Sequence, residues 1–446
     1  MSDLQFPDGF LWGTATASFQ IEGGRKERGD SIWDDFCAWP GKVVDGDTGD
    51  VADDHYHRYQ QDVDLLKAFN ANTYRFSISW PRVLPQGTGE VNHVGLDFYS
   101  RLVDALLAAG IEPFITLYHW DLPSALQRLG GWVNRDTVYR YVDYAEIVAK
   151  KLGDRVRYWI THNEPWVAAI LGHHEGVHAP GWTDHSLALQ VGHHLLLSHG
   201  LAMPLLHQLT KAGSRLGITL NLSQVYAASD KTEDIEAAKR YDGHLNRWYL
   251  DPVLLGNYPQ DIWQQLGWRV PRIAPQDMDI IGTPIDFLGI NNYSRAVIGH
   301  SDEGENHIQS IRPKGEYTAM DWEVYPQGIK ALLVRVTREY GAPDLYVTEN
   351  GCAYEDTISD DGQVHDPQRV DFFRRYLKAC HEAITEGVQL KGYLAWSLLD
   401  NFEWSFGYSR RFGITYVDYA TQERIPKDSA KFLSEVFRSN SLPQEA

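Results

Sequence analysis

Residues 366–400, DPQRVDFFRRYLKACHEAITEGVQLKGYLAWSLLD, contain a helical pattern followed directly by a strand pattern. Apolar side chains recur at steps of three and four over residues 370–384, which is the spacing of one face of an amphipathic helix. Asp366 is a residue type that favours the N-cap, and Gly387 stands where such a helix would end. The run Leu390–Asp400 then predicts a strand. The segment therefore indicates one helix–strand unit of an α/β protein.

The same alternation of patterns extends over the whole chain. The candidate strands are Phe10–Ala17, Thr73–Trp80, Glu112–Trp120, Tyr158–Pro165, Ser214–Ser223, Asp286–Ser294, Asp344–Gly351 and Leu390–Asp400. Several, such as FITLY at residues 114–118, are apolar without alternation, which is typical of parallel strands covered on both faces. This number of units is that of a (β/α)8 or TIM barrel. No linker-like tract divides the chain, so we expect residues 1–446 to form a single domain with long βα loops at its carboxyl-terminal face.

Charge and cysteine content exclude several classes of protein. Lysine plus arginine number 41 and aspartate plus glutamate 60, a formal net charge of −19, which disfavours nucleic acid and anionic membranes as partners. No apolar run is long enough to span a bilayer, and the start MSDLQFPDGFLWG lacks the pattern of a secretory signal. The cysteines, Cys37, Cys352 and Cys380, have neither disulfide-type nor metal-ligand spacing. These features predict a cytoplasmic protein with free thiols.

Polar residues stand at the carboxyl ends of many of the candidate strands. They lie in the sequences TYRFSISW (73–80), YHWD (118–121), THNEP (161–165), NNYS (291–294), TENG (348–351) and AWSLLDNFEW (395–404). In a barrel these ends meet at one mouth, which is where the active sites of this fold lie. The chain also holds 15 tryptophans and 24 tyrosines, and large flat rings suit a site that stacks against a sugar ring.

Two glutamates stand at such strand ends, Glu164 in THNEP and Glu349 in TENG. They end the fourth and the seventh strand, so they can face each other across the mouth of a barrel. Glycosidic bonds are cleaved by a pair of carboxyl groups, one acting as acid and the other as nucleophile or base. The pair predicts a glycosidase, with an ordinary structural role for either glutamate as the alternative.

The sequence resembles glycoside hydrolase family 1, the β-glucosidase family, over essentially its whole length. The segments that carry the resemblance are FPDGFLWGTATASFQIEG (6–23), RFSISWPRVLP (75–85), ITLYHWDLP (115–123), THNEP (161–165), GVHAPG (176–181), NNY (291–293), VTENG (347–351) and WSLLDNFEWSFGYSRRFG (396–413). The resemblance implies a retaining β-glucosidase that acts on aryl and alkyl β-glucosides, cellobiose and short cello-oligosaccharides, as in cellulose degradation, with no cofactor and no metal. A broader gluco-, galacto- and fuco-specificity with transglycosylation is the alternative.

Carried over position by position, the resemblance makes Glu164 the acid/base and Glu349 the nucleophile. It implies that the sugar is bound by Gln20, His119, Trp120, Asn163, Asn291, Tyr293, Trp396, Glu403 and Trp404. Arg75 takes a supporting position, where it and the Tyr293 phenol would favour the ionised form of Glu349. The charge of Glu349 would in turn raise the pKa of Glu164 and keep that group protonated.

Other roles remain open for some of these residues. Arg75 and His119 are also suited to packing at the barrel mouth, and Trp120 and Trp396 to the core. Asn291 is as well suited to supporting the site as to contacting the substrate. On the aglycone side, we expect the entrance to be lined by Trp166, Val167, His178 and Trp322.

Variant activities leave different signatures. The carboxylate of Glu403 would repel a sugar 6-phosphate, and the intact THNEP argues against a thioglucosidase, which lacks the acid glutamate. A transglycosylase would use the same residues, whereas a non-catalytic sugar-binding barrel would have no use for both glutamates. His174 and His178 are four residues apart, but Gly176 and Pro180 argue against the helix that would align them on a metal, so we expect no metal site.

Overall fold

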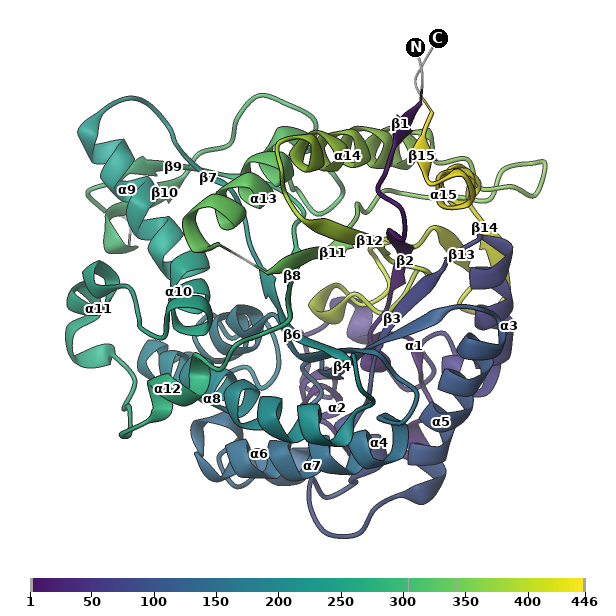
Figure 1. The fold of residues 1–446 in the computed structure, drawn as a ribbon, viewed down its shortest axis with the longest axis horizontal. Helices are drawn as coiled ribbons and strands as arrows, with labels where there is room; N and C mark the ends of the chain where they lie inside the picture. Colours follow the sequence, from purple (N-terminus) through teal and green to yellow (C-terminus); the bar gives the residue numbers. More distant parts are fainter. Residues whose placement is uncertain (1–2, 304, 342, 444–446) are drawn as a thin grey trace.

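The computed structural model describes residues 3–303, 305–341 and 343–443; residues 1–2, 304, 342 and 444–446 of the predicted domain lie outside the described residues. Eight parallel strands form a closed barrel at the centre of the molecule (Figure 1). Around the barrel the strands follow chain order, and the last one, β12, pairs with the first one, β2. The barrel strands are β2 Leu11–Ala15, β3 Thr73–Ser77, β4 Glu112–Tyr118, β5 Tyr158–Asn163, β6 Arg215–Asn221, β8 Phe287–Asn291, β11 Asp344–Asn350 and β12 Leu390–Trp396. The predicted (β/α)8 barrel is confirmed.

Helices follow the strands and surround the barrel (Figure 1). The long ones are α3 His55–Ala68, α5 His93–Ala108, α7 Asp136–Leu152, α8 His185–Leu209, α13 Pro326–Tyr340, α14 Pro367–Thr385 and α15 Asp428–Ser439. Between β6 and β8 lie α9 Thr232–Asp242, α10 Trp248–Leu255, α11 Gln260–Leu266 and α12 Asp277–Ile281. Further short helices are α1 Ser18–Ile21, α2 Ile32–Cys37, α4 Trp80–Val83 and α6 Ser124–Gln127. Single turns are η1 Arg25–Glu27, η2 Val44–Gly46, η3 Gly131–Val133, η4 Val167–Leu171, η5 Gly243–Arg247, η6 Gly267–Arg269, η7 Glu305–His307 and η8 Trp404–Phe406.

The start of α14 confirms the predicted N-cap position but not a capping role for its side chain. The helix begins at Pro367, directly after Asp366, but the Asp366 side chain makes no capping hydrogen bond. Its carboxylate instead accepts hydrogen bonds from the backbone N–H and the hydroxyl of Ser429, at 2.8 and 2.5 Å, and from Arg369. A buried charge is stabilised more by a cation and two donors than by one backbone amide, so Asp366 joins α14 to α15 rather than capping its own helix.

Aromatic rings close the amino-terminal end of the barrel interior. Phe114 of β4 stacks on Tyr158 of β5 at 4.8 Å between ring centroids, and it meets Phe287 of β8 and Tyr346 of β11 at 5.3 and 5.5 Å. Because β4 is not a neighbour of β8 or β11, these contacts run through the interior of the barrel. We call these four rings the aromatic plug. It confines any site within the barrel to the carboxyl-terminal end.

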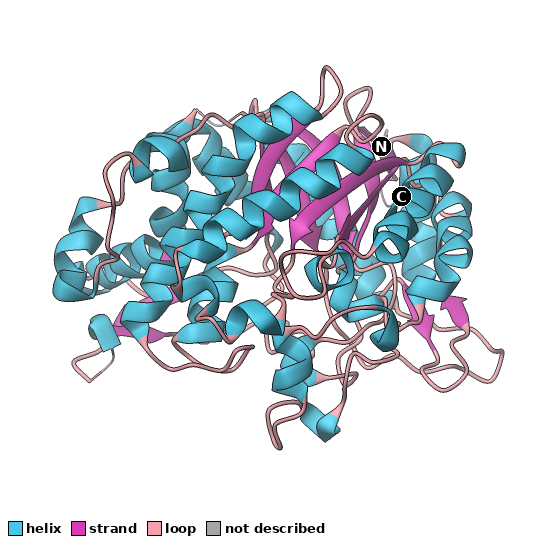
Figure 2. Ribbon diagram, turned by 90° about the horizontal axis from the view of Figure 1, so that it is seen from below, coloured by secondary structure: helices cyan, strands magenta, loops and turns pink. Residues whose placement is uncertain are grey.

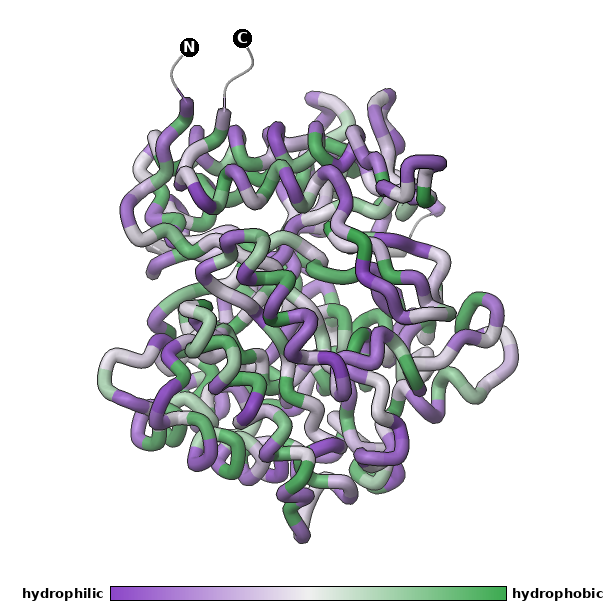
Figure 3. The backbone as a smooth tube through the Cα atoms, turned by 90° about the vertical axis from the view of Figure 1, so that its right-hand side faces the viewer, coloured by the Kyte–Doolittle hydropathy of each residue, from purple (hydrophilic) through white to green (hydrophobic). Residues whose placement is uncertain are grey.

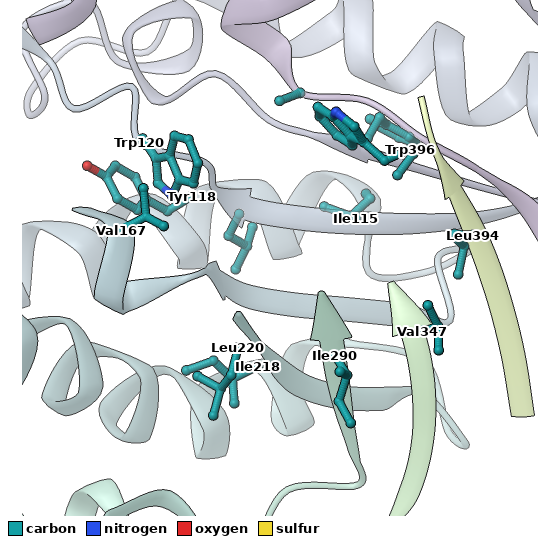
Figure 4. Packing of buried hydrophobic residues seen from close by; sticks show 14 of the residues in the cluster. Ile115, Tyr118, Trp120, Val167, Ile218, Leu220, Ile290, Val347, Leu394 and Trp396 are labelled. Carbon is teal, nitrogen blue, oxygen red and sulfur yellow. The ribbon is translucent and has the colours of Figure 1, made fainter. Parts of the chain in front are cut away.

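The outer faces of the strands pack against the surrounding helices. Side chains alternate between the two faces of a strand, so Ile290 and Val347 point away from the plug residues that stand near them in sequence. Figure 4 shows these two side chains with Ile218 and Leu220 of β6 in the hydrophobic packing, and each of the four is at most 1% exposed. The barrel is therefore stabilised by packing on both faces of its sheet, with the aromatic plug inside and the helices outside.

The long connections gather at one end of the barrel, below the strands in the view of Figure 2. They include a three-stranded sheet of β7 Val225–Ala227, β9 Ala296–His300 and β10 Ile308–Ser310, and the pair β13 Thr415–Val417 and β14 Arg424–Pro426. The first and last strands, β1 Leu4–Gln5 and β15 Ser441–Leu442, pair with each other and lie side by side (Figure 3).

Two further expectations concern the cysteines and the membrane. Cys37, Cys352 and Cys380 are buried and free, as predicted. Among the helices of the described ranges, none combines the length and the apolar character that crossing a membrane requires.

Candidate active site

Glu164 and Glu349 lie at the carboxyl ends of two barrel strands that are separated by β6 and β8. Glu164 follows β5 directly, and Glu349 is the next-to-last residue of β11. The two residues are only 5% and 3% exposed. Both line one cavity of about 870 Å³ at the mouth of the barrel. The two predicted carboxyl groups therefore share a single site.

Both carboxylate oxygens of Glu349 are held by the protein. Arg75 of β3 donates to Oε1 at 2.5 Å, and the Tyr293 hydroxyl donates to Oε2 at 2.6 Å. Burial raises the pKa of Glu349 above its ordinary value, while Arg75 and Tyr293 act in the opposite direction. Arg75 is itself fully buried, so its single positive charge favours an ionised Glu349 beside it.

Glu164 has a different environment. Its Oε1 accepts a hydrogen bond from the Asn291 amide at 2.6 Å, and within the described residues no cation forms an ion pair with it. Burial, reinforced by the neighbouring Glu349, raises the pKa of Glu164 to about 8. At neutral pH the protonated form of Glu164 therefore predominates, as the sequence analysis expects from the pairing with Glu349.

A chain of hydrogen bonds orients the side chains next to the glutamates. The amide oxygen of Asn163 accepts from Arg75 at 2.7 Å and from Asn291 at 3.0 Å. Its Nδ2 must therefore be the donor to Nε2 of His119, at 3.0 Å. Burial lowers the pKa of His119 well below its ordinary value, so the ring is neutral and its proton lies on Nδ1. That nitrogen has no hydrogen-bond partner among the described residues.

Three tryptophans surround this polar chain. The His119 ring lies nearly parallel to the ring of Trp396, with 6.0 Å between centroids, and Trp120 packs against Trp404 at 4.7 Å. Trp120 also donates to the backbone oxygen of Asn163 at 2.9 Å. Figure 4 shows Trp120 just beyond the end of β4 and Trp396 at the end of β12. All three predicted tryptophans are buried and also line the cavity.

Gln20 of α1 lies next to Glu403, which lines the cavity directly before η8. The Gln20 amide donates to Asn401 and to the Phe402 backbone oxygen at 2.9 Å, and it lies 3.5 Å from Oε2 of Glu403. Burial, with the nearby Glu349 as a second cause, raises the pKa of Glu403 to about 8. The protonated form of Glu403 therefore predominates at neutral pH, whereas the sequence alone predicts a carboxylate.

Three of the predicted site residues have a left-handed backbone conformation. The φ angles are 78° at Trp120, 47° at Glu164 and 51° at Trp404. Residues other than glycine rarely adopt positive φ, and such positions occur frequently at functional sites because the surrounding structure must hold them there. In each case the conformation occurs where the chain leaves a strand or enters a loop.

The chain matches glycosyl hydrolase family 1 over residues 2–442. It belongs to this family. The family predicted from the sequence motifs is thus confirmed, and with it the prediction of a retaining glycosidase.

Relatives within family 1 are similar over their full length. The chain is 48% identical to "Beta-glucosidase A" of Acetivibrio thermocellus, covering 99% of this chain and 100% of that protein. It is 46% identical to the "Bifunctional beta-D-glucosidase/beta-D-fucosidase" of Bifidobacterium breve, covering 95% and 96%. The solved structure of the β-glucosidase from Thermotoga maritima in complex with deoxynojirimycin has a TM-score of 0.97 at 46% identity, covering 99% of this chain and 100% of that one.

The four residues expected at the entrance also belong to the cavity lining. They are Trp166, Val167, His178 and Trp322. Three of the other predicted residues, Gln20, Arg75 and Asn163, are not among the residues that line the cavity, but each contacts a side chain that does.

Many further lining residues were not predicted from the sequence. They come from the loops after β5, β6 and β8, the small sheet and the tail segment, and they include Leu171, Val177, Tyr241, Arg295, Arg312, Tyr317, Met320, Phe406 and Phe412. Most of these positions lie in loops or short helical turns, whose path depends on contacts with the rest of the fold and not on local periodicity, whereas Tyr241 lies in α9. No sequence signal of the kind used here identifies them.

The histidine-rich stretch has no metal-binding arrangement. The His174 ring stacks on His185 at 4.3 Å, whereas His178 meets the ring of Trp33 at 5.2 Å. Within the described part of the chain, no group of three or more His, Cys, Asp or Glu side chains is arranged to hold a metal ion.

Proposed function

We propose that this protein is an exo-acting β-glucosidase that removes terminal non-reducing β-D-glucosyl residues from aryl and alkyl glucosides, cellobiose and short cello-oligosaccharides. The observation that carries the proposal is the unequal support of the two glutamates. Arg75 and Tyr293 bind both oxygens of Glu349, whereas Glu164 accepts from an uncharged amide and has a pKa of about 8. One carboxylate nucleophile and one carboxylic acid are the pair that a double displacement requires.

In the first step, a Glu349 oxygen attacks the anomeric carbon of the bound glucoside. The bond from that carbon to the glycosidic oxygen breaks, and Glu164 transfers its proton to the departing oxygen. The products are a glycosyl ester of Glu349, the free alcohol and an ionised Glu164. Arg75 and Tyr293 hold the attacking carboxylate in place until it reacts.

In the second step, the protonation of Glu164 is reversed. Esterification removes the negative charge of Glu349, so Glu164 no longer has a like charge beside it and its pKa falls. The Glu164 carboxylate then accepts a proton from a water molecule, which attacks the anomeric carbon and releases the sugar with its β-configuration. Free Glu349 and protonated Glu164 are restored.

The sugar is held by polar and aromatic side chains around the glutamates. We assign substrate contacts to Gln20, His119, Trp120, Asn163, Trp396, Glu403 and Trp404. A hydrogen bond from Asn163 to the sugar 2-hydroxyl would strengthen in an oxocarbenium-like transition state. Asn291 has its amide engaged by Glu164 and Asn163 and its oxygen by Thr348, which supports a positioning role.

Substrate range and biological setting follow as further proposals. Hydrolysis of cello-oligosaccharides would place the protein in cellulose degradation, and a broader gluco-, galacto- and fuco-specificity is supported by the relative named as a β-D-glucosidase/β-D-fucosidase. Free buried thiols support a cytoplasmic location. We also propose that residues 1–446 act as one catalytic domain, because barrel strands from Leu11 to Trp396 form a single closed sheet.

Product analysis tests the proposal. Hydrolysis of an aryl β-glucoside, followed by proton NMR, is expected to give β-glucose first, and cellobiose is expected to give glucose alone. Added methanol distinguishes the transglycosylase alternative: methyl β-glucoside as the main product at low methanol concentration would favour it. Absence of turnover with both substrates would refute the proposed function.

A further inference from the structure

A second, much smaller cavity lies directly behind Trp120. Its volume is about 10 Å³, and it is lined by Ile32, Trp33, Tyr118, Trp120, Trp132, Ala168, His173, His178 and Ala179. A cavity of roughly 10–15 Å³ is large enough for a single water molecule. Trp120 and His178 also line the large substrate cavity, so they form the wall between the two.

Four of the residues that line the small cavity carry a buried nitrogen without a hydrogen-bond partner among the described residues. These atoms are Nε1 of Trp33, Nε1 of Trp132, Nε2 of His173 and Nδ1 of His178. The Trp132 indole lies close to the Tyr118 hydroxyl on the same wall, without a hydrogen bond of ordinary geometry between them. Buried polar atoms in native proteins almost always have a partner, so four around one small cavity indicate a shared ligand.

The chemistry of the four nitrogens is complementary to water. An indole N–H can only donate, so Trp33 and Trp132 supply donors. Nδ1 of His173 contacts the backbone oxygen of Ala168 at 2.9 Å, and an oxygen of this kind only accepts. Nδ1 therefore carries the proton, and Nε2 of His173 is an acceptor because burial lowers the pKa of His173 to about 4. Water, which donates twice and accepts twice, fits this set.

We propose that Trp33, Trp132, His173 and His178 hold one buried water molecule behind Trp120, and that this water fixes the tautomer of His178. The water accepts from the two indoles and donates to Nε2 of His173 and to Nδ1 of His178. The His178 ring is neutral, since burial lowers its pKa to about 3. Its proton is therefore on Nε2, which makes His178 a hydrogen-bond donor on the wall of the substrate cavity.

Neutron diffraction from crystals grown in heavy water tests the site directly. The expected result is one water molecule at about 2.7–3.2 Å from the four nitrogens, with deuterium on Nε2 of His178 and on Nδ1 of His173. A cavity without water, or deuterium on Nδ1 of His178, would overturn the proposal. This measurement does not depend on activity, so its failure is distinct from a failure of the proposed function.

Kinetics test the consequence for the substrate and rest on the proposed β-glucosidase activity. His173→Leu removes the acceptor, and it is expected to raise KM for cellobiose roughly twofold to tenfold, the cost of one neutral hydrogen bond. His173→Gln retains an acceptor and is expected to recover most of this loss. In a His178→Phe background, His173→Leu is expected to change KM no further, because the donor that it acts through is gone.

The matched control is His199→Leu. His199 is buried, and its Nε2 also has no partner among the described residues, but it does not line the small cavity. Its replacement is expected to lower Tm without the rise in KM. An equal rise in KM in the control, an unchanged KM in His173→Leu, or an effect of His173→Leu that persists in the His178→Phe background would each refute the link between the water site and the substrate.

Discussion

The side-chain amide of Asn291 donates to Glu164 at 2.6 Å. The same nitrogen donates to Asn163, whose oxygen also accepts from Arg75, and Arg75 in turn binds Glu349. A single buried network thus joins the proposed acid/base to the proposed nucleophile. Because each member is fixed by the next, the protonation state of one carboxyl group is coupled to that of the other.

Removing the Asn291 amide is expected to move the alkaline limb of the pH profile. Glu164 must be protonated to act as an acid, so kcat/KM falls as the pH rises through its pKa of about 8. The hydrogen bond from Asn291 lowers this pKa, so Asn291→Ala raises it and shifts the limb to higher pH. Profiles of kcat/KM on an aryl β-glucoside measure the shift. Asn292→Ala is the control, since Asn292 is buried next to it but donates to Leu222 and Ser294; an alkaline limb that moves equally in both variants would argue against the assignment.

Tyr293→Phe is expected to act on the opposite limb. The phenol hydrogen bond lowers the pKa of Glu349, and the nucleophile must be ionised. Without the phenol that pKa rises, so activity is lost at a higher pH as the solution is acidified. Loss of a hydrogen bond to a charged group, worth about 1.5–3 kcal/mol, predicts a roughly 10- to 100-fold lower kcat/KM at neutral pH. An acidic limb that stays where it is in the wild-type profile would contradict the role of Tyr293.

Hydrolysis is expected to retain the anomeric configuration. Direct attack by Glu349 requires the two carboxyl groups to be about 5–5.5 Å apart, against a wider gap in inverting enzymes. The first product from a β-glucoside should therefore be the β-anomer, as seen by NMR before mutarotation. An α-anomer as the first product would exclude the double displacement.

Alanine variants of the two glutamates are expected to give glycosyl azides of opposite anomeric configuration when azide is added. Glu349→Ala should lose nearly all turnover and regain some with azide, which attacks the sugar carbon from the vacated side to give an α-glycosyl azide. Glu164→Ala should still form the glycosyl ester from substrates with activated leaving groups, and azide then gives the β-product. The same anomer from both variants is incompatible with separate roles.

Glu403 is expected to set the preference for unphosphorylated sugars. Glu403→Ser should lower kcat/KM for aryl β-glucosides at least tenfold, on the order of 1.4 kcal/mol, and narrow the gap between a glucoside and its 6-phosphate. Because the pKa of Glu403 is about 8, the wild-type discrimination against the phosphate should also widen as the pH rises through that value. If Glu403 only supports the loop through Trp404, Glu403→Ser should lower stability and activity together. The ratio of kcat/KM for the glucoside to kcat/KM for its 6-phosphate should then stay constant.

The sequence patterns were sufficient for the barrel and for most of the predicted residues that gather at its mouth. Polar residues at strand ends, such as Asn163 and Glu349, have a position that follows from the fold class alone, because the carboxyl ends of barrel strands always converge. Some predicted strands extend beyond the observed ones at their carboxyl ends, because some polar residues there already belong to the loops at the mouth. The predicted strand Leu390–Asp400 ends at Trp396 in the structure, since the chain leaves the sheet there and continues to the segment 403–406, which lines the cavity.

Other properties depend on distances that a sequence does not contain. The direction of the Asn163–His119 hydrogen bond is decided by two donors from other strands, Arg75 and Asn291. The raised pKa of Glu403 depends on how completely the surrounding residues remove it from water. Asp366 has the residue type and position of an N-cap, yet two of its three hydrogen bonds come from Ser429, more than 60 residues away, and the third from Arg369.

The aromatic plug at the amino-terminal end of the barrel determines the order of events in catalysis. Phe114, Tyr158, Phe287 and Tyr346 meet through the barrel interior and leave the carboxyl-terminal mouth as the route between the cavity and solvent. The glucosyl unit must then enter before the rest of the substrate and leave after it. The alcohol released in the first step must leave through the mouth before a water molecule can enter for the second. An alcohol present at high concentration enters through the same mouth and competes with water for the glycosyl ester. The yield of transfer products therefore depends on how alcohol and water exchange at that opening.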